Sequence, residues 1–287
     1  MLGGGGSTGN AWLIGVIAGL AEAGTPVTDA DRIIGTSAGS TAAAQITGTN
    51  VSDLLAAALT PAASPRPGSR QIVQPPSRAV TPHLERLKAI IAAAADSMDM
   101  RRRIGAASLE QAVSDGSVRD RWRATVASRL PSPDWPDREI HITAVDARTG
   151  EPVVFDRNSG VELVDAVAAS CSNGSGVPPY RIGDRWYLDG GYRRNENADL
   201  GAGCARVLVL TPFGGRSLHP ATWKTQLAAQ VDELRHAGSA VEVLAPRAEE
   251  EHLFGANAMN PSLRPDAARA GFELGLAQAE RLSTFWG

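Results

Sequence analysis

The chain has 287 residues, enough for one large α/β domain. Its formal net charge is -3 and its longest basic run is Arg101-Arg102-Arg103, so a nucleic-acid-binding function is not expected. The two cysteines, Cys171 and Cys204, lack the spacing of metal ligands, and no metal site is predicted.

The sequence carries no pattern typical of secretion or of a membrane span. The residues after Met1 lack a basic n-region, and no apolar run approaches the roughly 20 residues that cross a bilayer. The low cysteine content fits a reducing compartment. We therefore expect a cytoplasmic protein, with peripheral contact to a membrane surface left open. The oligomeric state is not predicted.

The first sixty residues predict a glycine-rich loop, a helix, a short strand and a second helix. The loop covers residues 3–9, and the helix covers residues 11–23, where apolar side chains recur at helical spacing. Gly24 is suited to end this helix as its C′ residue. A short apolar strand follows at residues 32–34, and Ser37 opens the next helix.

Residues 61–82 are rich in Pro and Ser and show little periodicity, which is typical of a long surface loop. Loops of this length often serve as lids or binding loops, so this segment is a candidate lid. Helices are predicted at residues 84–95, 108–113 and 118–130. The arginine triplet is interpreted as part of a solvated helix face.

The second half of the chain alternates short strands with helices. Strands are expected at residues 139–146 and 152–155 as a hairpin, at 180–188 as two strands around a Gly183-Asp184 turn, and at 206–210 and 240–244 as buried parallel strands. Helices are expected at residues 161–169, 223–236 and 264–282. This alternation predicts a single α/β domain with a mostly parallel central sheet flanked by helices.

The segment Gly35-Thr36-Ser37-Ala38-Gly39 lies between the predicted strand and the second helix. A serine at the centre of G-x-S-x-G can sit on a strained strand-to-helix elbow with its hydroxyl exposed. The flanking glycines leave room for the turn, and the helix N-terminus favours negative charge nearby. The pattern predicts that Ser37 is a nucleophile that attacks an ester.

Glycines also crowd the loop Gly3-Gly4-Gly5-Gly6-Ser7-Thr8-Gly9. Consecutive glycines can direct backbone N–H groups into one concavity, and a following helix N-terminus completes an anion site. In an esterase such a loop would be an oxyanion hole. The loop also matches G-x-G-x-x-G through Gly4, Gly6 and Gly9, which leaves dinucleotide binding as an alternative. That alternative lacks the acidic residue expected at the end of the second strand.

The turn Asp189-Gly190-Gly191 follows an apolar segment. The two glycines leave the Asp189 carboxylate with little steric cover, so it can approach another side chain closely. The alternative interpretation is an ordinary turn, because Asp-Gly is a common turn pair.

These three motifs, in this order, resemble the pattern of the patatin-like phospholipase family, which is G-G-G-x-[RK]-G, then G-x-S-x-G, then D-G-[GA]. The resemblance covers residues 2–197. It implies a three-layer α/β fold and a cofactor-independent hydrolase that acts on lipids or small esters. By the same resemblance, Ser37 is the nucleophile, Asp189 is the base of a Ser-Asp dyad, and the oxyanion hole is formed by Gly4, Gly5 and Gly6.

A Ser-Asp dyad also fits the histidines, since none of the five lies in a catalytic-looking motif. A Ser-His-Asp arrangement would require His219, His236 or His252 to approach in space, which the chain order permits.

The sequence departs from the family pattern in three places. Thr8 stands where the family usually has Arg or Lys, and residues 172–176 are polar and glycine-rich. Only Met1-Leu2 precede the glycine loop, where the family has a buried central strand, and neighbouring strands would be left with unpaired backbone groups. These departures keep an alternative open, namely a catalytically impaired protein that binds acyl chains or a membrane surface.

Overall fold

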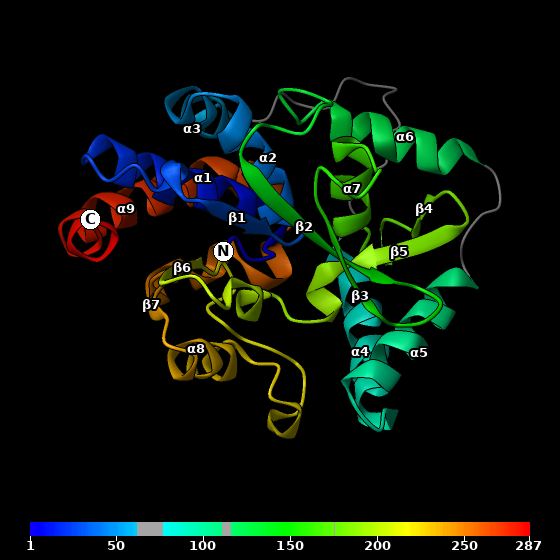
Figure 1. Ribbon diagram of the computed structural model, residues 1–287. Coiled ribbons are helices and arrows are strands. Elements are labelled where there is room, and N and C mark those ends of the chain that lie inside the picture. The colour runs from blue at the N-terminus through cyan, green and yellow to red at the C-terminus, as the bar shows by residue number, and fades with distance from the viewer. Residues whose placement is uncertain (62–76, 111–115, 175) are drawn as a thin grey trace.

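The computed structural model describes residues 1–61, 77–110, 116–174 and 176–287 as an α/β fold with helices on both faces of a central sheet (Figure 1). Strands in these ranges are Arg32–Gly35 (β1), Glu139–Asp146 (β2), Pro152–Phe155 (β3), Tyr180–Ile182 (β4), Arg185–Asp189 (β5), Arg206–Leu210 (β6) and Ala240–Leu244 (β7). Helices are Gly6–Glu22 (α1), Ala38–Gly48 (α2), Val51–Leu59 (α3), Ser77–Ala93 (α4), Ser97–Leu109 (α5), Gly116–Ala127 (α6), Leu163–Ser170 (α7), Leu227–His236 (α8) and Arg264–Trp286 (α9). None of these helices combines the length and hydropathy that crossing a bilayer requires.

The central sheet is mixed. β1 pairs with β2 in parallel, whereas β3 and β5 both run antiparallel to β2, and β4 continues the sheet beyond β5. β6 and β7 form a parallel pair, as predicted. The predicted α/β class is confirmed, but the sheet is less parallel than expected. Tight turns join β2 to β3 and β4 to β5, and only antiparallel strands can be joined in this way.

Met1 and Leu2 join the two parts of the sheet. The Leu2 N–H donates to the Ile34 carbonyl at 2.8 Å, and the Leu2 carbonyl accepts from the Thr36 N–H at 3.0 Å. On the other side, the Leu210 N–H donates to the Met1 carbonyl at 2.9 Å. Leu2 therefore forms parallel bridges to both β1 and β6, and Figure 1 places the N-terminus between these strands. At this end of the two strands, the expected gap in the sheet is filled.

At their other ends, β1 and β6 border a cavity of about 520 Å³, lined among others by Arg32, Val207 and Trp286. Met1 also lines it, and the Met1 amine donates to the Leu208 carbonyl at 2.8 Å. Burial lowers the pKa of this amine from 8.0 to about 5. The amine is therefore mostly uncharged at neutral pH.

Successive residues of β6 face two different cores. Leu208 and Leu210 belong to the large core that includes α1, α2, α7 and α9, whereas Val207 and Val209 pack with α8. Figure 1 shows α8 below the β6–β7 pair and α1 above it. This alternation is the two-residue period of a strand that is covered on both faces.

Helix α1 lies deep in the large core because glycines let α9 approach it closely. A Cβ at Gly15 would lie 2.1 Å from the Ala268 carbonyl oxygen, and one at Gly271 would lie 2.3 Å from the Trp12 carbonyl oxygen. Such contacts leave no space for a side chain. They fix the position of the helix whose N-terminus carries the glycine loop.

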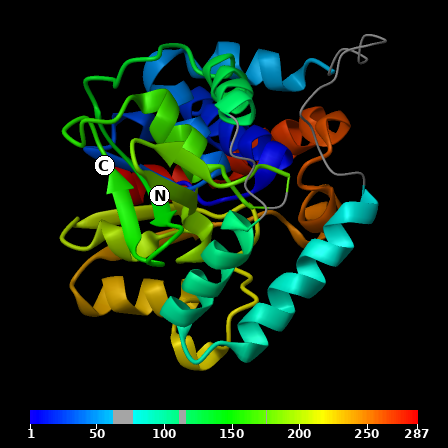
Figure 2. The same cartoon turned by 90° about the vertical axis from the view of Figure 1, so that its right-hand side faces the viewer.

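Two predictions around α4 need correction. The proposed surface loop at 61–82 falls mostly on residues outside the described ranges, but its last six residues, 77–82, belong to α4. The helix predicted at residues 84–95 therefore begins earlier than expected, and Pro82 lies inside it. In Figure 2, α4 and α5, both cyan to green, form a pair at the edge of the molecule.

Of the helix predicted at 108–113, residues 108 and 109 form the end of α5, and residues 111–113 lie outside the described ranges. Helices α3 and α5 were not predicted, and in α5 the arginine triplet hides the apolar spacing. Arg101 is buried, and its Nε donates to the Gly150 carbonyl at 2.6 Å. The triplet is therefore not entirely a solvated face.

Candidate active site

Ser37 occupies a strained turn between β1 and α2. Its backbone angles are φ 53° and ψ -116°, outside the regions that residues other than glycine normally adopt. Such strain persists only where surrounding contacts enforce it, and it concentrates at functional sites. The half-buried Ser37 side chain lies at the carboxyl end of β1, as the sequence predicts for an elbow.

The glycines of G-x-S-x-G are needed because backbone segments touch at this turn. A Cβ at Gly35 would lie 2.5 Å from the Gly39 carbonyl oxygen. A Cβ at Gly39 would lie 1.9 Å from the Leu2 carbonyl oxygen. The elbow therefore forms only where α2 can pack directly against β1 and against Leu2.

The backbone of Ser37 is held by the C-terminal end of α7. The Ser37 N–H donates to the Ser170 hydroxyl at 2.9 Å. The Ser37 carbonyl accepts from the Ser40 hydroxyl at 2.6 Å and from the Cys171 thiol at 3.2 Å. Burial raises the pKa of the Cys171 thiol to about 11, so it stays protonated as a donor. These contacts hold the strained conformation in place.

Asp189 ends β5, and its carboxylate lies close enough to the Ser37 side chain for that side chain to lower its pKa. The Gly191 N–H donates to Asp189 Oδ1 at 2.8 Å, and the Asp189 N–H donates to the Ser172 carbonyl at 2.9 Å. Burial raises the pKa of Asp189 from 3.8 to about 6, and the hydrogen bonds from Ser37 and Gly191 oppose that rise. A carboxylate with a pKa near 6 is a better proton acceptor near neutral pH than an exposed one.

The two glycines after Asp189 have different neighbours. A Cβ at Gly190 would lie 2.2 Å from the Thr143 hydroxyl oxygen, so the turn packs directly on β2. A Cβ at Gly191 would lie 3.0 Å from Asp189 Oδ1. Gly190 therefore lets the turn approach the sheet, and Gly191 leaves its own amide free to reach the carboxylate.

The glycine loop lies beside Ser37. A Cβ at Gly4 would lie 3.5 Å from the Ser37 Cβ and 2.7 Å from Asn195 Oδ1. However, the Gly4 N–H donates to the Asn195 carbonyl at 3.1 Å. That amide is therefore engaged within the protein, whereas the prediction assigned it to an oxyanion.

The amides of Gly5 and Gly6 are placed differently. Gly5 precedes α1, and Gly6 is its first residue, so neither N–H has an acceptor inside the helix. Ala38, the first residue of α2, is in the same position. These three amides lie at two helix N-termini, where the helix dipoles favour negative charge. The sequence analysis did not include Ala38 among the candidate donors.

An arginine lies beside the glycine loop although Thr8 carries no charge. The Thr8 N–H donates to the Ala258 carbonyl at 3.0 Å. Arg264, at the start of α9, donates from Nη1 to the Ser7 carbonyl at 2.8 Å. A guanidinium thus contacts the first turn of α1, but it comes from a position 257 residues along the chain from Ser7. No local motif could have indicated it.

Four of the five histidines have partners other than Ser37 and Asp189. His141 lies 3.1 Å from Glu139, and His219 contacts the Thr225 hydroxyl at 2.9 Å. His236 and His252 contact backbone carbonyls of their own segments. Within the described residues, no group of three or more His, Cys, Asp or Glu side chains could hold a metal ion. Among the predicted site residues, the fold brings the side chains of Ser37 and Asp189 close together.

Comparison with known proteins agrees with the order of the motifs. The model of the patatin-like phospholipase family matches residues 1–201, which is more than half of the chain and includes the glycine loop, Ser37 and Asp189. No curated protein matches the chain.

Proposed function

Because the chain belongs to the patatin-like phospholipase family, a family of lipid acyl hydrolases, we propose that it cleaves carboxylic ester bonds of lipids through Ser37 and Asp189. One observation supports this proposal: the Ser37 side chain, on a strained elbow, lies beside the buried Asp189 carboxylate, whose pKa is raised by burial to about 6. A nucleophile in contact with a base of suitable pKa is the minimal machinery for acyl transfer.

In the proposed reaction, Asp189 accepts the Ser37 proton as the hydroxyl oxygen attacks the ester carbonyl. The tetrahedral intermediate collapses, the protonated Asp189 returns the proton to the departing alcohol, and an acyl-enzyme remains. Asp189 then deprotonates a water molecule that attacks the acyl-enzyme. When this second intermediate collapses, Asp189 returns the proton to the Ser37 oxygen, and the fatty acid is released. The same carboxyl group acts as base and acid in turn.

The oxyanion of the intermediate would be stabilised by backbone amides of the glycine loop and of α2. We assign this role to Gly5, Gly6 and Ala38, since the Gly4 amide is already bonded to Asn195. Removal of one such donor typically raises the barrier by about 2.7–4 kcal/mol. Arg264 adds positive charge to the same helix turn.

The experiment is hydrolysis of short- and long-chain acyl esters and of phospholipid vesicles, together with labelling by a fluorophosphonate probe. Ser37→Ala should abolish labelling and reduce hydrolysis to the background rate. Ser239→Ala is the matched control, because Ser239 is buried and donates to the Cys204 carbonyl at 2.7 Å, away from the dyad. It should retain both activities.

Equal hydrolysis by the native protein and by Ser37→Ala would contradict the proposal. Acyl-chain binding without labelling of Ser37 would instead favour the non-catalytic alternative. A preference for vesicles over monomeric short esters would identify lipids, and not small esters, as the substrate class.

A further inference from the structure

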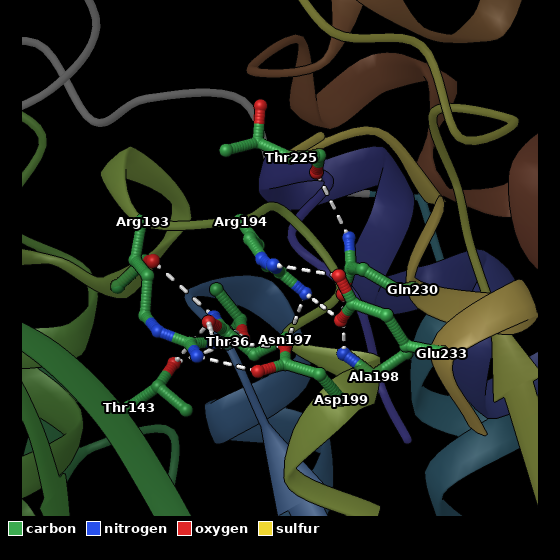
Figure 3. Close-up of polar contacts among 11 residues, drawn as sticks. Thr36, Thr143, Arg193, Arg194, Asn197, Ala198, Asp199, Thr225, Gln230 and Glu233 are labelled. Atoms are coloured by element: carbon green, nitrogen blue, oxygen red, sulfur yellow. Dashed lines mark hydrogen bonds and ion pairs between the residues drawn. The ribbon is translucent and has the colours of Figure 1, made fainter. Parts of the chain in front are cut away.

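Asn197 lies fully buried beneath the proposed dyad, eight residues after Asp189. Its backbone is left-handed, with φ 48° and ψ 36°, a conformation that asparagine tolerates better than most residues. It immediately precedes the 3₁₀ helix Ala198–Gly201. Figure 3 shows its side chain among polar groups from several segments.

The carboxamide nitrogen of Asn197 binds a chain neighbour of each member of the dyad. It donates to the Thr36 hydroxyl at 3.0 Å and to the Gly190 carbonyl at 3.2 Å. Thr36 immediately precedes Ser37, and Gly190 immediately follows Asp189. One amide group therefore ties the residue before the nucleophile to the residue after the base.

The orientation of this amide is fixed from its other side. The carboxamide oxygen accepts from Arg193 Nη1 at 2.8 Å, and a guanidinium can only donate. Arg193 Nη1 also donates to Asp199 Oδ1 at 2.9 Å, so the guanidinium itself is anchored (Figure 3). The amide nitrogen consequently faces Thr36 and Gly190.

Thr143 of β2 closes the arrangement. Its hydroxyl lies 2.9 Å from the Thr36 hydroxyl and 3.3 Å from the Asn197 amide nitrogen. Gly190 packs against this same hydroxyl. Thr36, Thr143 and Asn197 are all buried, so a bond lost here is not replaced by bulk water.

From this geometry we propose that Asn197 is the positioning residue of the Ser37–Asp189 pair. It sets how closely the elbow and the Asp189 turn approach one another, while touching neither reacting group. The inference rests on the proposed hydrolase function. In this proposal, a residue outside the three motifs sets the distance between Ser37 and Asp189. Proton transfer from Ser37 to Asp189 depends on that distance.

The test compares Asn197→Ala with Gln230→Ala. Gln230 is also fully buried; it accepts from the Ala198 N–H at 2.7 Å and donates to the Thr225 carbonyl at 3.0 Å (Figure 3). Its loss removes two buried hydrogen bonds from the same region but none to Thr36 or Gly190. Both variants remove buried hydrogen bonds from one region, but only Asn197→Ala removes the link between the dyad segments. Asn197→Ala also places alanine in a left-handed backbone, so each kcat is compared with the Tm of the same variant.

Asn197→Ala should lower kcat by about 10- to 100-fold and leave KM within about twofold, because misplacement by about 1 Å can cost that much. Gln230→Ala should keep kcat within about threefold at a comparable Tm. The proposal is overturned if Asn197→Ala keeps its kcat, or if both variants lose kcat in proportion to their loss of Tm.

Asn197→Asp adds a readout that a purely structural role would not move. The carboxylate cannot donate to the Gly190 carbonyl, and its charge lies near Asp189. The acid limb of the pH–rate profile should move to higher pH, since a like charge disfavours ionisation of Asp189. An acid limb at the native position would contradict the proposed proximity.

Amide hydrogen exchange separates this inference from the proposed function. In Asn197→Ala, the Ser37 and Gly191 amides should exchange at least about tenfold faster than in Gln230→Ala. Ser37 follows Thr36 and Gly191 follows Gly190, the two residues that Asn197 holds, so loss of its hydrogen bonds should let both segments open more often. If the native protein neither labels nor hydrolyses esters, the proposed function fails, but this exchange result still decides whether Asn197 holds the segments. Unchanged protection of both amides would overturn the inference.

Discussion

The two ends of strand β1 are built in opposite ways. At the carboxyl end, Gly35, Gly39 and Leu2 touch so closely that no Cβ fits between them. At the amino end, Arg32 and its neighbours border a cavity of about 520 Å³. The same strand therefore passes from an open edge to one of the tightest contacts in the molecule.

This difference shows that a single residue of the N-terminal segment, Leu2, provides the backbone contacts that the elbow needs on this side of the sheet. The Leu2 carbonyl accepts the Thr36 N–H, and it is also the surface against which Gly39 packs. One residue thus completes the ladder and shapes the turn that carries Ser37. The geometry of the elbow depends on contacts within this short stretch.

The largest effect is expected from Gly39→Ala, which breaks the tight end. A Cβ placed 1.9 Å from the Leu2 carbonyl oxygen would meet backbone, which cannot rotate away. Overpacking usually lowers the free energy of unfolding by about 1–3 kcal/mol. Because this Cβ would meet backbone, we expect a loss at or above the upper limit. We expect loss of Ser37 labelling and a strong fall in Tm, measured by calorimetry.

Gly116→Ala is the control for that substitution. A Cβ at Gly116 would have Asp120 Oδ2, at 4.0 Å, as its nearest neighbour. Alanine is favoured over glycine within helices, so this variant should match or exceed the native Tm. Native Ser37 labelling and a native Tm in Gly39→Ala would show that the contact between Gly39 and Leu2 does not determine the geometry of the elbow.

The second-largest effect is expected at Asp189. Its raised pKa suits its proposed function as a base but lowers the stability of the fold at neutral pH. Its folded pKa of about 6 exceeds the usual 3.8, so folding favours the protonated form. Ionisation of Asp189 therefore lowers the free energy of unfolding. This loss is absent below pH 4, grows between pH 4 and 6, and reaches about 3 kcal/mol above pH 6, since one pKa unit equals about 1.4 kcal/mol.

Asp189→Asn should therefore abolish hydrolysis and raise the free energy of unfolding by about 1–3 kcal/mol at pH 7, less whatever the weaker bond to Ser37 costs. The gain should vanish at pH 4. Urea unfolding at both pH values measures it, and a variant less stable than the native protein at pH 7 would refute the expectation.

A smaller effect is expected in the pH dependence of the native enzyme. Because the ionised Asp189 accepts the proton, kcat/KM should fall as pH drops through about 6. The loss at pH 5 should be about tenfold relative to the plateau. A profile that stays flat down to pH 5 would exclude a base with this pKa.

The smallest effect is expected at the open end. Val27 lines the cavity, and Val27→Ile adds one methylene to unfilled space. Cavity filling commonly gains about 0.5–2 kcal/mol, and one methylene belongs near the lower limit. The Tm should rise slightly while kcat stays unchanged, whereas a change in kcat would show that the cavity and the elbow are coupled.

Short-range patterns predicted much of this molecule. Strands β2, β3, β6 and β7 lie where alternating or apolar runs predicted them. The burial of a strand depends on the pattern of residues that are close in the sequence, so it can be recognised there. The resemblance carried by three ordered motifs indicated Ser37 and Asp189 as a pair, and the structure places them close together, while their roles stay a prediction. Helix α5 was missed since its buried positions include an arginine whose partner is the Gly150 carbonyl.

The rest of the site depends on contacts between distant segments. The Gly4 amide is engaged by Asn195, Arg264 reaches the first turn of α1, and Asn197 joins Thr36 to Gly190. None of these residues carries a distinctive local pattern. Their partners become known only when the fold brings together positions far apart in the sequence.

The buried amine of Met1 has a practical consequence for handling the protein. Anything attached ahead of it, such as a purification tag or a fluorescent label, would have to leave through the space between β1 and β6. This space is lined by apolar side chains such as Val207 and by the charged Arg32 and Arg206, so a polyhistidine tag would have to fit among them. Gly287, exposed at the end of α9, is the safer attachment point.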